Sequence, residues 1–257
     1  MPLTDSSRPT TRAELVDSLQ GEWLARAPEM TWDQFRTQFF VWNQGQHVAL
    51  IGPNDSGKTT LALNILDQRR FVVATATKPY DDTLEQFGQT RHYKRLESWD
   101  RNLDPHLHNH RLLWPDARDL YAAINQRREF QKAFREIYAQ GGWTLYIDEL
   151  WFICKHLKLE FEMRTFLLQS RSNKISLVVA TQRPAWVPLE VYDQSRWLFF
   201  WRDNDEGNLK RIGGISWLSK NLVQSIVARL RPHEVLCINT RTGQMVRTMS
   251  PPPEGKR

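Results

Sequence analysis

Cysteine is scarce in this sequence, and long apolar runs are absent. The two cysteines, Cys154 and Cys237, lie inside apolar stretches without metal-ligand spacing, so we expect buried free thiols in a reducing compartment. No stretch approaches the roughly 18 to 20 apolar residues that a membrane-spanning helix needs, and the N-terminus lacks a basic segment followed by an apolar one. These absences predict a soluble, cytoplasmic protein without a membrane span.

The excess of positively over negatively charged residues is also small. The 35 Lys and Arg residues stand against 29 Asp and Glu, which gives a net charge of +6 and a pI near 9.4. This excess suits a polyanionic partner but does not establish one. The 11 tryptophans mostly lie in apolar patterns, where packing is expected rather than base stacking.

The chain of 257 residues suits one large α/β domain with extensions. Residues 1–12 are polar and predict a flexible arm, and residues 250–257 predict a flexible tail. Residues 13–45, which open with a helical pattern over 13–27, predict an N-terminal extension packed on the core. The core itself is expected over 46–249.

Within the core, apolar strands alternate with helical segments, which predicts a mainly parallel sheet covered by helices on both faces. The expected strands are 47–51, 71–77, 143–147, 175–181 and 196–201, with an edge strand at 111–114 and a C-terminal β-hairpin of 235–239 and 245–249. The expected helices are 58–69, 117–139 and 150–170.

The strongest functional signal is Gly52-Pro-Asn-Asp-Ser-Gly-Lys-Thr59, between an apolar strand and a helix. Glycines permit a backbone that wraps a phosphate, with its N–H groups at the positive end of the helix. Lys58 is expected to reach the β- and γ-phosphates of ATP, and the Thr59 hydroxyl to ligate Mg²⁺. The predicted nucleotide-binding residues are Gly52, Pro53, Asn54, Asp55, Ser56, Gly57, Lys58, Thr59 and Thr60.

Two carboxylates end the buried strand of Leu145-Tyr-Ile-Asp-Glu149. We expect Asp148 to complete the Mg²⁺ shell, partly through water, and Glu149 to polarise the attacking water. An exposed surface pair is the alternative. The phosphate loop upstream favours the catalytic interpretation.

A third strand ends in polar groups at Leu177-Val-Val-Ala-Thr-Gln-Arg-Pro184. Ligands in open parallel sheets bind at the carboxyl ends of strands, so Gln182 is a candidate to contact both the γ-phosphate and the water. The alternative is a polar loop closed by Pro184.

The segments GPNDSGKT, LYIDEL and ATQRP, in this order, resemble the HerA/FtsK superfamily of P-loop ATPases over about residues 46–215. The resemblance implies a RecA-like P-loop NTPase core of the catalytic-glutamate type, ring assembly that is often hexameric, and ATP-driven movement of double-stranded DNA. By position, Lys58 and Thr59 match the Walker A pair, Asp148 and Glu149 the Walker B pair, and Gln182 the sensor glutamine. ABC transporter ATPases have a similar phosphate loop, but the room before Asp148 is too short for their signature helix.

Ring ATPases of this family complete each site with an arginine from the neighbouring subunit. Arg171 resembles one recurrent family arginine, although Ser170 precedes it, and Arg196 resembles another. Arg202 and Arg211 are further options. The alternative for each is a surface or phosphate-contacting arginine.

Two other segments leave alternatives open. His106-Leu-His-Asn-His110 suggests either a loop, which we favour, or a metal site without a spaced partner. The basic residues between Lys78 and Arg101, interleaved with Tyr93 and Trp99, suggest either a DNA-facing loop or a solvated linker.

The sequence therefore predicts an ATPase, stimulated by DNA, that translocates or packages double-stranded DNA as a homo-oligomeric ring. No winged helix or long N-terminal barrel is recognisable, so we expect a compact motor, bacterial or phage-encoded, that takes its specificity from a portal, relaxase or nuclease. The alternatives are an ATPase for protein assembly or secretion and a nucleotide-dependent switch with little turnover.

Overall fold

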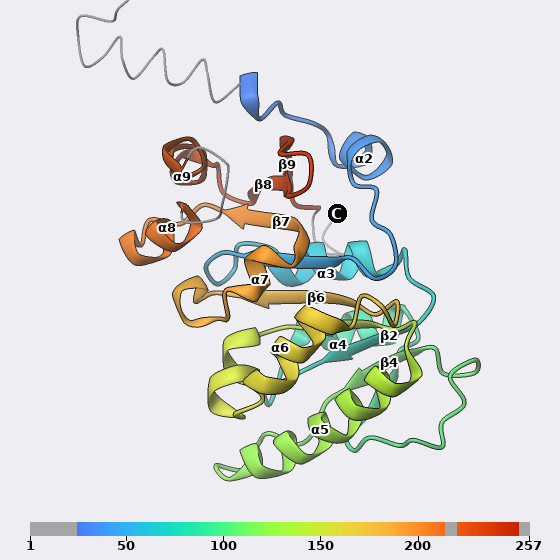
Figure 1. Cartoon of the computed structure of the whole chain (residues 1–257). Coiled ribbons are helices and arrows are strands. Elements are labelled where there is room, and N and C mark those ends of the chain that lie inside the picture. Colours follow the sequence, from blue (N-terminus) through green and yellow to red (C-terminus); the bar gives the residue numbers. More distant parts are fainter. Residues whose placement is uncertain (1–24, 214–219, 252–257) are drawn as a thin grey trace, which may run out of the picture.

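The computed structural model of the chain describes residues 25–213 and 220–251 (Figure 1). The predicted arm, most of the predicted helix over 13–27 and the end of the predicted tail lie outside these residues. Both cysteines are buried and free, as expected.

A nine-stranded sheet runs through the described residues in the order β3-β4-β2-β5-β6-β1-β7-β8-β9 (Figure 1). Strands from β3 to β7 pair in parallel, and β8 and β9 continue the sheet in antiparallel fashion. The bounds are β1 His47–Ile51, β2 Val72–Thr75, β3 Lys94–Leu96, β4 His110–Leu113, β5 Thr144–Ile147, β6 Ser176–Thr181, β7 Ser195–Trp201, β8 Glu234–Asn239 and β9 Met245–Met249. The predicted mainly parallel sheet and C-terminal hairpin are confirmed.

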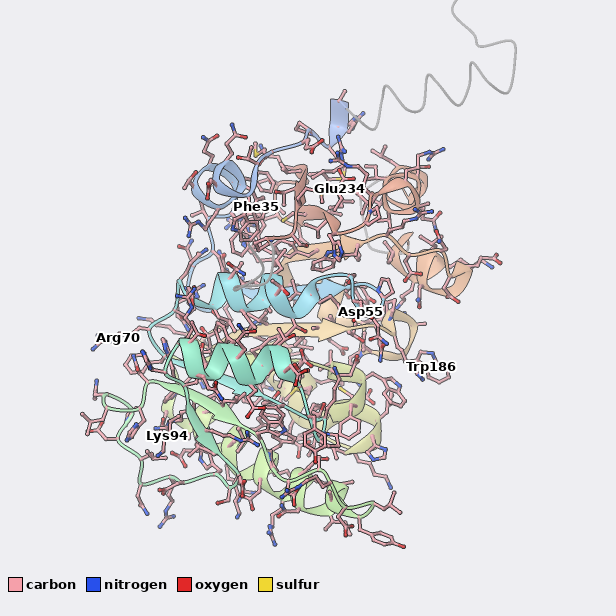
Figure 2. The ribbon with its side chains drawn as sticks, turned by 180° about the vertical axis from the view of Figure 1, so that it is seen from behind. Phe35, Asp55, Arg70, Lys94, Trp186 and Glu234 are labelled. Atoms are coloured by element: carbon pink, nitrogen blue, oxygen red, sulfur yellow. The ribbon has the colours of Figure 1, made fainter. Side chains whose placement is uncertain are left out.

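Helices cover both faces of the sheet, which confirms the predicted α/β architecture. One face carries α5 Ala122–Gln140, α6 Glu160–Gln169, α7 Glu190–Asp193, α8 Glu206–Gly213 and α9 Lys220–Arg229. Figure 2, seen from behind, shows α3 Lys58–Leu66 and α4 Asp82–Thr90 on the other face. Every residue of the central strands β1, β5 and β6 is buried, because both of their faces are covered.

An aromatic segment precedes β1 and packs on the same face as α3. It contains α2 Trp32–Gln34 and the π-helical turn η1 Phe35–Phe39. Phe40 contacts Trp197 and Phe199 of β7, with ring centroids 5.0 and 5.6 Å apart. The extension over 13–45 as a unit stays a prediction.

Three sequence expectations were wrong in detail. The strand predicted at an edge is β4, which lies inside the sheet because the unexpected strand β3 pairs outside it. The single helix predicted over 150–170 is two elements, the π-helical turn η2 Phe152–His156 and α6, separated where Lys158 adopts φ 56°. The helix predicted over 117–139 begins only at Ala122.

Candidate active site

The phosphate loop links β1 to α3 at the carboxyl edge of the parallel strands, where Figure 2 places Asp55. Gly57 has φ 103° immediately before α3, a conformation that favours glycine. A Cβ atom on Gly52 would lie 2.8 Å from Cβ of Trp201, so the loop lies directly against β7. Both glycines of the motif are therefore required by the local structure.

Lys58 is folded back into its own loop. Its Nζ donates hydrogen bonds to the carbonyl oxygens of Gly52 at 2.8 Å and Pro53 at 2.5 Å. Burial lowers the pKa of Lys58 to about 8, against the opposing effects of Glu149 and Asp148. The ammonium group lies at the base of the loop, from which it can turn toward a bound phosphate.

Asp148 and Thr59 form the candidate magnesium site. The Thr59 hydroxyl donates to Oδ1 of Asp148 at 3.0 Å, and the Tyr146 phenol donates to the same oxygen at 2.6 Å. A hydroxyl and a carboxylate are the hard oxygen ligands that Mg²⁺ prefers, usually beside water and substrate phosphates. The donor set therefore fits the ion that the sequence predicts.

Glu149 lies beside this site on the segment after β5. Its Oε1 accepts hydrogen bonds from the Thr181 hydroxyl and from the Trp151 N–H, both at 3.2 Å. Burial raises the pKa of Glu149 despite these bonds and the attraction of Lys58. A partly buried, oriented carboxylate of this kind is suited to act as a general base.

A cavity of about 880 Å³ joins these groups. It is lined by the phosphate loop, the ends of β5 and β6 with Asp148, Glu149 and Gln182, and two further segments. All of the predicted Walker A, Walker B and sensor positions thus lie at one edge, although Gly52, Pro53 and Ser56 do not line the cavity themselves. The roles assigned to them remain predictions.

The two further segments were not expected at the site. One is the loop after β2 with the first turn of α4, which contributes Thr77, Lys78, Pro79, Asp81 and Thr83; the other is the open end of the hairpin, with His233, Met249, Ser250 and Pro251. The rule that ligands meet strand ends already points to Lys78, which directly follows the predicted second strand. No sequence signal points to Ser250, whose hydroxyl accepts a hydrogen bond from Trp201 Nε1 at 3.0 Å and whose N–H donates to the carbonyl of His233.

Two of the arginines expected to act between subunits, Arg171 and Arg196, lie at the opposite edge of the sheet, whereas Arg202 directly follows the carboxyl end of β7. Arg171 precedes β6 and Arg196 is the second residue of β7, so both stand at the amino ends of parallel strands. Arg196 has a lowered pKa because it is partly buried and because Arg241 and Arg171 are near. Arg211 instead donates to the carbonyl of Val187. Arg171, Arg196 and Arg241, which come from three separate segments, thus lie near one another at the edge opposite the phosphate loop.

The segment from Lys78 to Arg101, for which the sequence left a DNA-facing loop and a solvated linker open, contains α4 and β3. Tyr93 and Trp99 are buried, each 8% exposed, so their rings are not available to nucleic acid. Arg95 pairs with Glu85 at 3.3 Å, and Lys94 begins the edge strand β3. His106 and His110 flank the loop before β4, and no cluster of three or more metal-ligating His, Cys, Asp or Glu side chains occurs in residues 25–213 and 220–251.

Solved structures provide the comparison for this arrangement, since no protein-family profile and no curated protein matches the sequence. The genome packaging NTPase B204 of Sulfolobus turreted icosahedral virus 2, in complex with sulfate, superposes with a TM-score of 0.60 at 15% identity, covering 80% of this chain and 96% of B204. Its complex with AMPPCP gives a TM-score of 0.56 at 14% identity, covering 80% and 97%.

VirB4 of Thermoanaerobacter pseudethanolicus has a TM-score of 0.59 at 11% identity, covering 81% of this chain and 90% of VirB4. This chain has the P-loop NTPase fold of these solved structures. The resemblance stated from the three motifs is confirmed at the level of the fold. No helix of the described P-loop domain is long and apolar enough to cross a membrane.

Proposed function

We propose that this protein is an ATP-hydrolysing motor of the FtsK/HerA type that translocates or packages double-stranded DNA as a homo-oligomeric, hexameric ring, with ATP and Mg²⁺ as cofactors. The observation that carries the proposal is the meeting of Lys58, the Thr59–Asp148 pair and Glu149 at one cavity. Phosphate binding, metal binding and water activation are the three requirements of ATP hydrolysis.

Different residues of the chain bind the phosphates, hold the metal ion and activate the water. Lys58 leaves the carbonyls of its loop and binds the β- and γ-phosphates, while the loop N–H groups surround them. Thr59 and Asp148 would hold Mg²⁺, which would neutralise charge on the phosphates. Glu149 accepts a proton from the attacking water, and Gln182 orients that water against the γ-phosphate.

The ring part of the proposal is supported by the position of the arginines. From Arg196 to Trp201, β7 extends about 17 Å at roughly 3.3 Å per residue, which separates Arg196 from the phosphate loop of its own chain. An arginine at this edge is suited to enter the site of a neighbouring subunit. The DNA part is supported by two B204 proteins, whose names describe genome packaging and DNA packaging, and by the net charge of +6.

The test is ATP turnover with and without linear duplex DNA, in a sample whose oligomeric state is measured by light scattering. We expect turnover that requires Mg²⁺ and rises with DNA. Lys58→Ala should abolish ATP binding, whereas Glu149→Gln should keep binding and lose turnover by a factor of about 10² to 10⁴.

Each alternative has its own outcome in this experiment. Turnover by a ring that duplex DNA does not stimulate would favour an ATPase for protein assembly or secretion. ATP binding without turnover in the wild-type protein would favour a nucleotide-dependent switch. Monomers that hydrolyse ATP at the full rate would contradict the ring.

A further inference from the structure

We propose that Lys78 is a second phosphate-binding lysine of this site, which contacts the γ-phosphate of ATP from the side opposite Lys58. This inference rests on the proposed function, because it assigns a role within the same reaction. Lys78 belongs to none of the three sequence motifs.

The backbone of Lys78 is held firmly at the edge of the site. Strand β2 pairs with β5, with Thr75 opposite Ile147, so the chain after β2 passes beside Asp148. The carbonyl of Lys78 accepts a hydrogen bond from Trp114 Nε1 at 2.8 Å, and the carbonyl of Thr77 accepts one from Gln126 at 2.9 Å. These bonds attach the segment both to the end of β4 and to α5.

The side chain of Lys78 is aimed at the site by two carboxylates. Its Nζ lies 3.4 Å from Oδ2 of Asp81 and 3.9 Å from Oδ2 of Asp148. Asp81 is itself fixed, because its Oδ1 caps α4 by accepting the N–H of Leu84 at 3.0 Å. The Lys78 side chain is 59% exposed, so the ammonium group is directed but free to move by a few ångströms.

The distribution of charge indicates what this ammonium group would bind. Among the described residues that line the cavity, Lys58 and Lys78 are the only lysines or arginines, whereas Asp55, Asp81, Asp148 and Glu149 are acidic. A γ-phosphate placed between Glu149 and Asp148 would meet carboxylates on both sides. Because β5 lies between β2 and the strands β6 and β1, Lys78 approaches that phosphate from the flank that Lys58 does not reach.

Two other roles for Lys78 predict different behaviour. If Lys78 only balances the charge of Asp148, its removal should leave ATP affinity and turnover intact and strengthen metal binding, because a competing cation is lost. If Lys78 contacts DNA, its removal should reduce only the stimulation by DNA. A γ-phosphate contact alone predicts that ATP binding suffers and ADP binding does not.

The experiment compares Lys78→Ala and Lys78→Arg with Lys94→Ala, which removes an exposed lysine of the same region from β3. ATP and ADP affinities are measured by titration calorimetry in the Glu149→Gln background, and basal turnover is measured with Glu149 intact. We expect Lys78→Ala to weaken ATP binding about ten-fold or more relative to ADP and to lower turnover at least as much, since a charge-assisted hydrogen bond is lost. Lys78→Arg should retain part of both, and Lys94→Ala should change neither.

If Lys78→Ala binds ATP and ADP as tightly as the parent protein does and keeps normal turnover, the assignment of Lys78 is overturned. A loss confined to DNA stimulation would overturn it as well. If the parent protein with Lys78 intact binds no ATP, the proposed function fails first, and this result is separate from the effect of Lys78. Thermal unfolding of each variant checks that the fold is kept.

Discussion

The phenol of Tyr146 donates a 2.6 Å hydrogen bond to Oδ1 of Asp148, two residues along the chain from it. Side chains at positions i and i+2 of a strand point to the same side, so the buried Tyr146 supports the carboxylate that follows it. Burial, with Asp148 adding to it, raises the pKa of Tyr146 well above its ordinary value, so the phenol remains a neutral donor. The candidate metal ligand is therefore oriented from within the sheet.

Removing this hydroxyl should weaken metal binding. Tyr146→Phe keeps the ring but frees Asp148 to rotate, and outer-shell partners of this kind typically contribute about ten-fold or more to metal affinity. We expect the Mg²⁺ concentration for half-maximal ATP turnover to rise about ten-fold, with a parallel loss of direct Mn²⁺ binding measured by electron paramagnetic resonance. Tyr93→Phe, at another buried tyrosine, is the control and should leave both unchanged. An unaltered Mn²⁺ affinity in Tyr146→Phe would show that Asp148 needs no such support.

Thr181 connects three parts of the site. Its hydroxyl donates to Oε1 of Glu149 and accepts the N–H of Arg183 at 3.1 Å, while its carbonyl accepts the N–H of Gly52 at 3.2 Å. Any movement of the turn after β6 is thus transmitted to Glu149 and to the phosphate loop.

Thr181→Val should slow turnover without weakening ATP binding. Valine has nearly the same shape but leaves Glu149 held only by backbone N–H groups, those of Trp151 and Gln182, so we expect kcat to fall about ten-fold or more, as for a mispositioned base. Thr181→Ser restores the hydroxyl and serves as the matched control. Steady-state kinetics over a range of ATP concentrations separates the two parameters, and a change in KM alone would argue against a positioning role.

The central strands could be predicted because covering both faces imposes continuous apolar sequence. His47–Ile51, Thr144–Ile147 and Ser176–Thr181 have this pattern, and their turns carry the nucleotide motifs. Strand β3 could not be predicted in this way, since two of its three residues are exposed and basic. It forms a strand because β4 offers it a partner, which is a tertiary effect.

The candidate site could be predicted in part for a related reason. Residues that directly follow strands, such as Asp148 and Gln182, are brought together by parallel topology alone. Ser250 and His233 join the cavity through the return of the C-terminal hairpin, and no local pattern encodes that path. Lys78 had the right position in the sequence, but its neighbouring basic residues left only a DNA-facing loop or a solvated linker as interpretations.

His47 predicts a pH dependence of stability. The buried ring accepts the N–H of Leu177 at its Nδ1 at 3.0 Å, and burial lowers the pKa of His47 to about 4 from 6.5 in the unfolded chain. The unfolded state therefore binds the proton more readily, so this contribution is complete above pH 6.5 and is lost as pH falls toward 4. The free energy of unfolding should fall by up to about 1.4 kcal/mol per pH unit in this window.

His47→Gln provides the comparison, because glutamine retains an acceptor for Leu177 but does not titrate. Urea unfolding of both proteins between pH 4 and 7 gives the difference between their free energies of unfolding. The contribution of the other titrating groups cancels in this difference. A difference that grows as pH rises supports the assignment, and parallel curves would contradict it.

The last prediction concerns the edge that carries Arg171 and Arg196. If either arginine completes the site of a neighbouring subunit, its replacement by alanine should reduce turnover by about a thousand-fold, as the loss of such an arginine does in other phosphoryl-transfer sites, while ATP binding within the subunit remains intact.

That variant and Glu149→Gln would each be inactive alone. When the two variants are assembled together in equal amounts, about a quarter of the subunit junctions would combine an intact Glu149 with an intact arginine from the next subunit. Turnover should therefore recover to about a quarter of the wild-type rate, and only on mixing before assembly. Arg36→Ala, at an exposed arginine 3.9 Å from Asp33 of its own chain, is the control and should keep normal turnover without mixing. If mixed rings formed with the Arg171 variant and those formed with the Arg196 variant both fail to recover turnover, neither arginine completes the shared site.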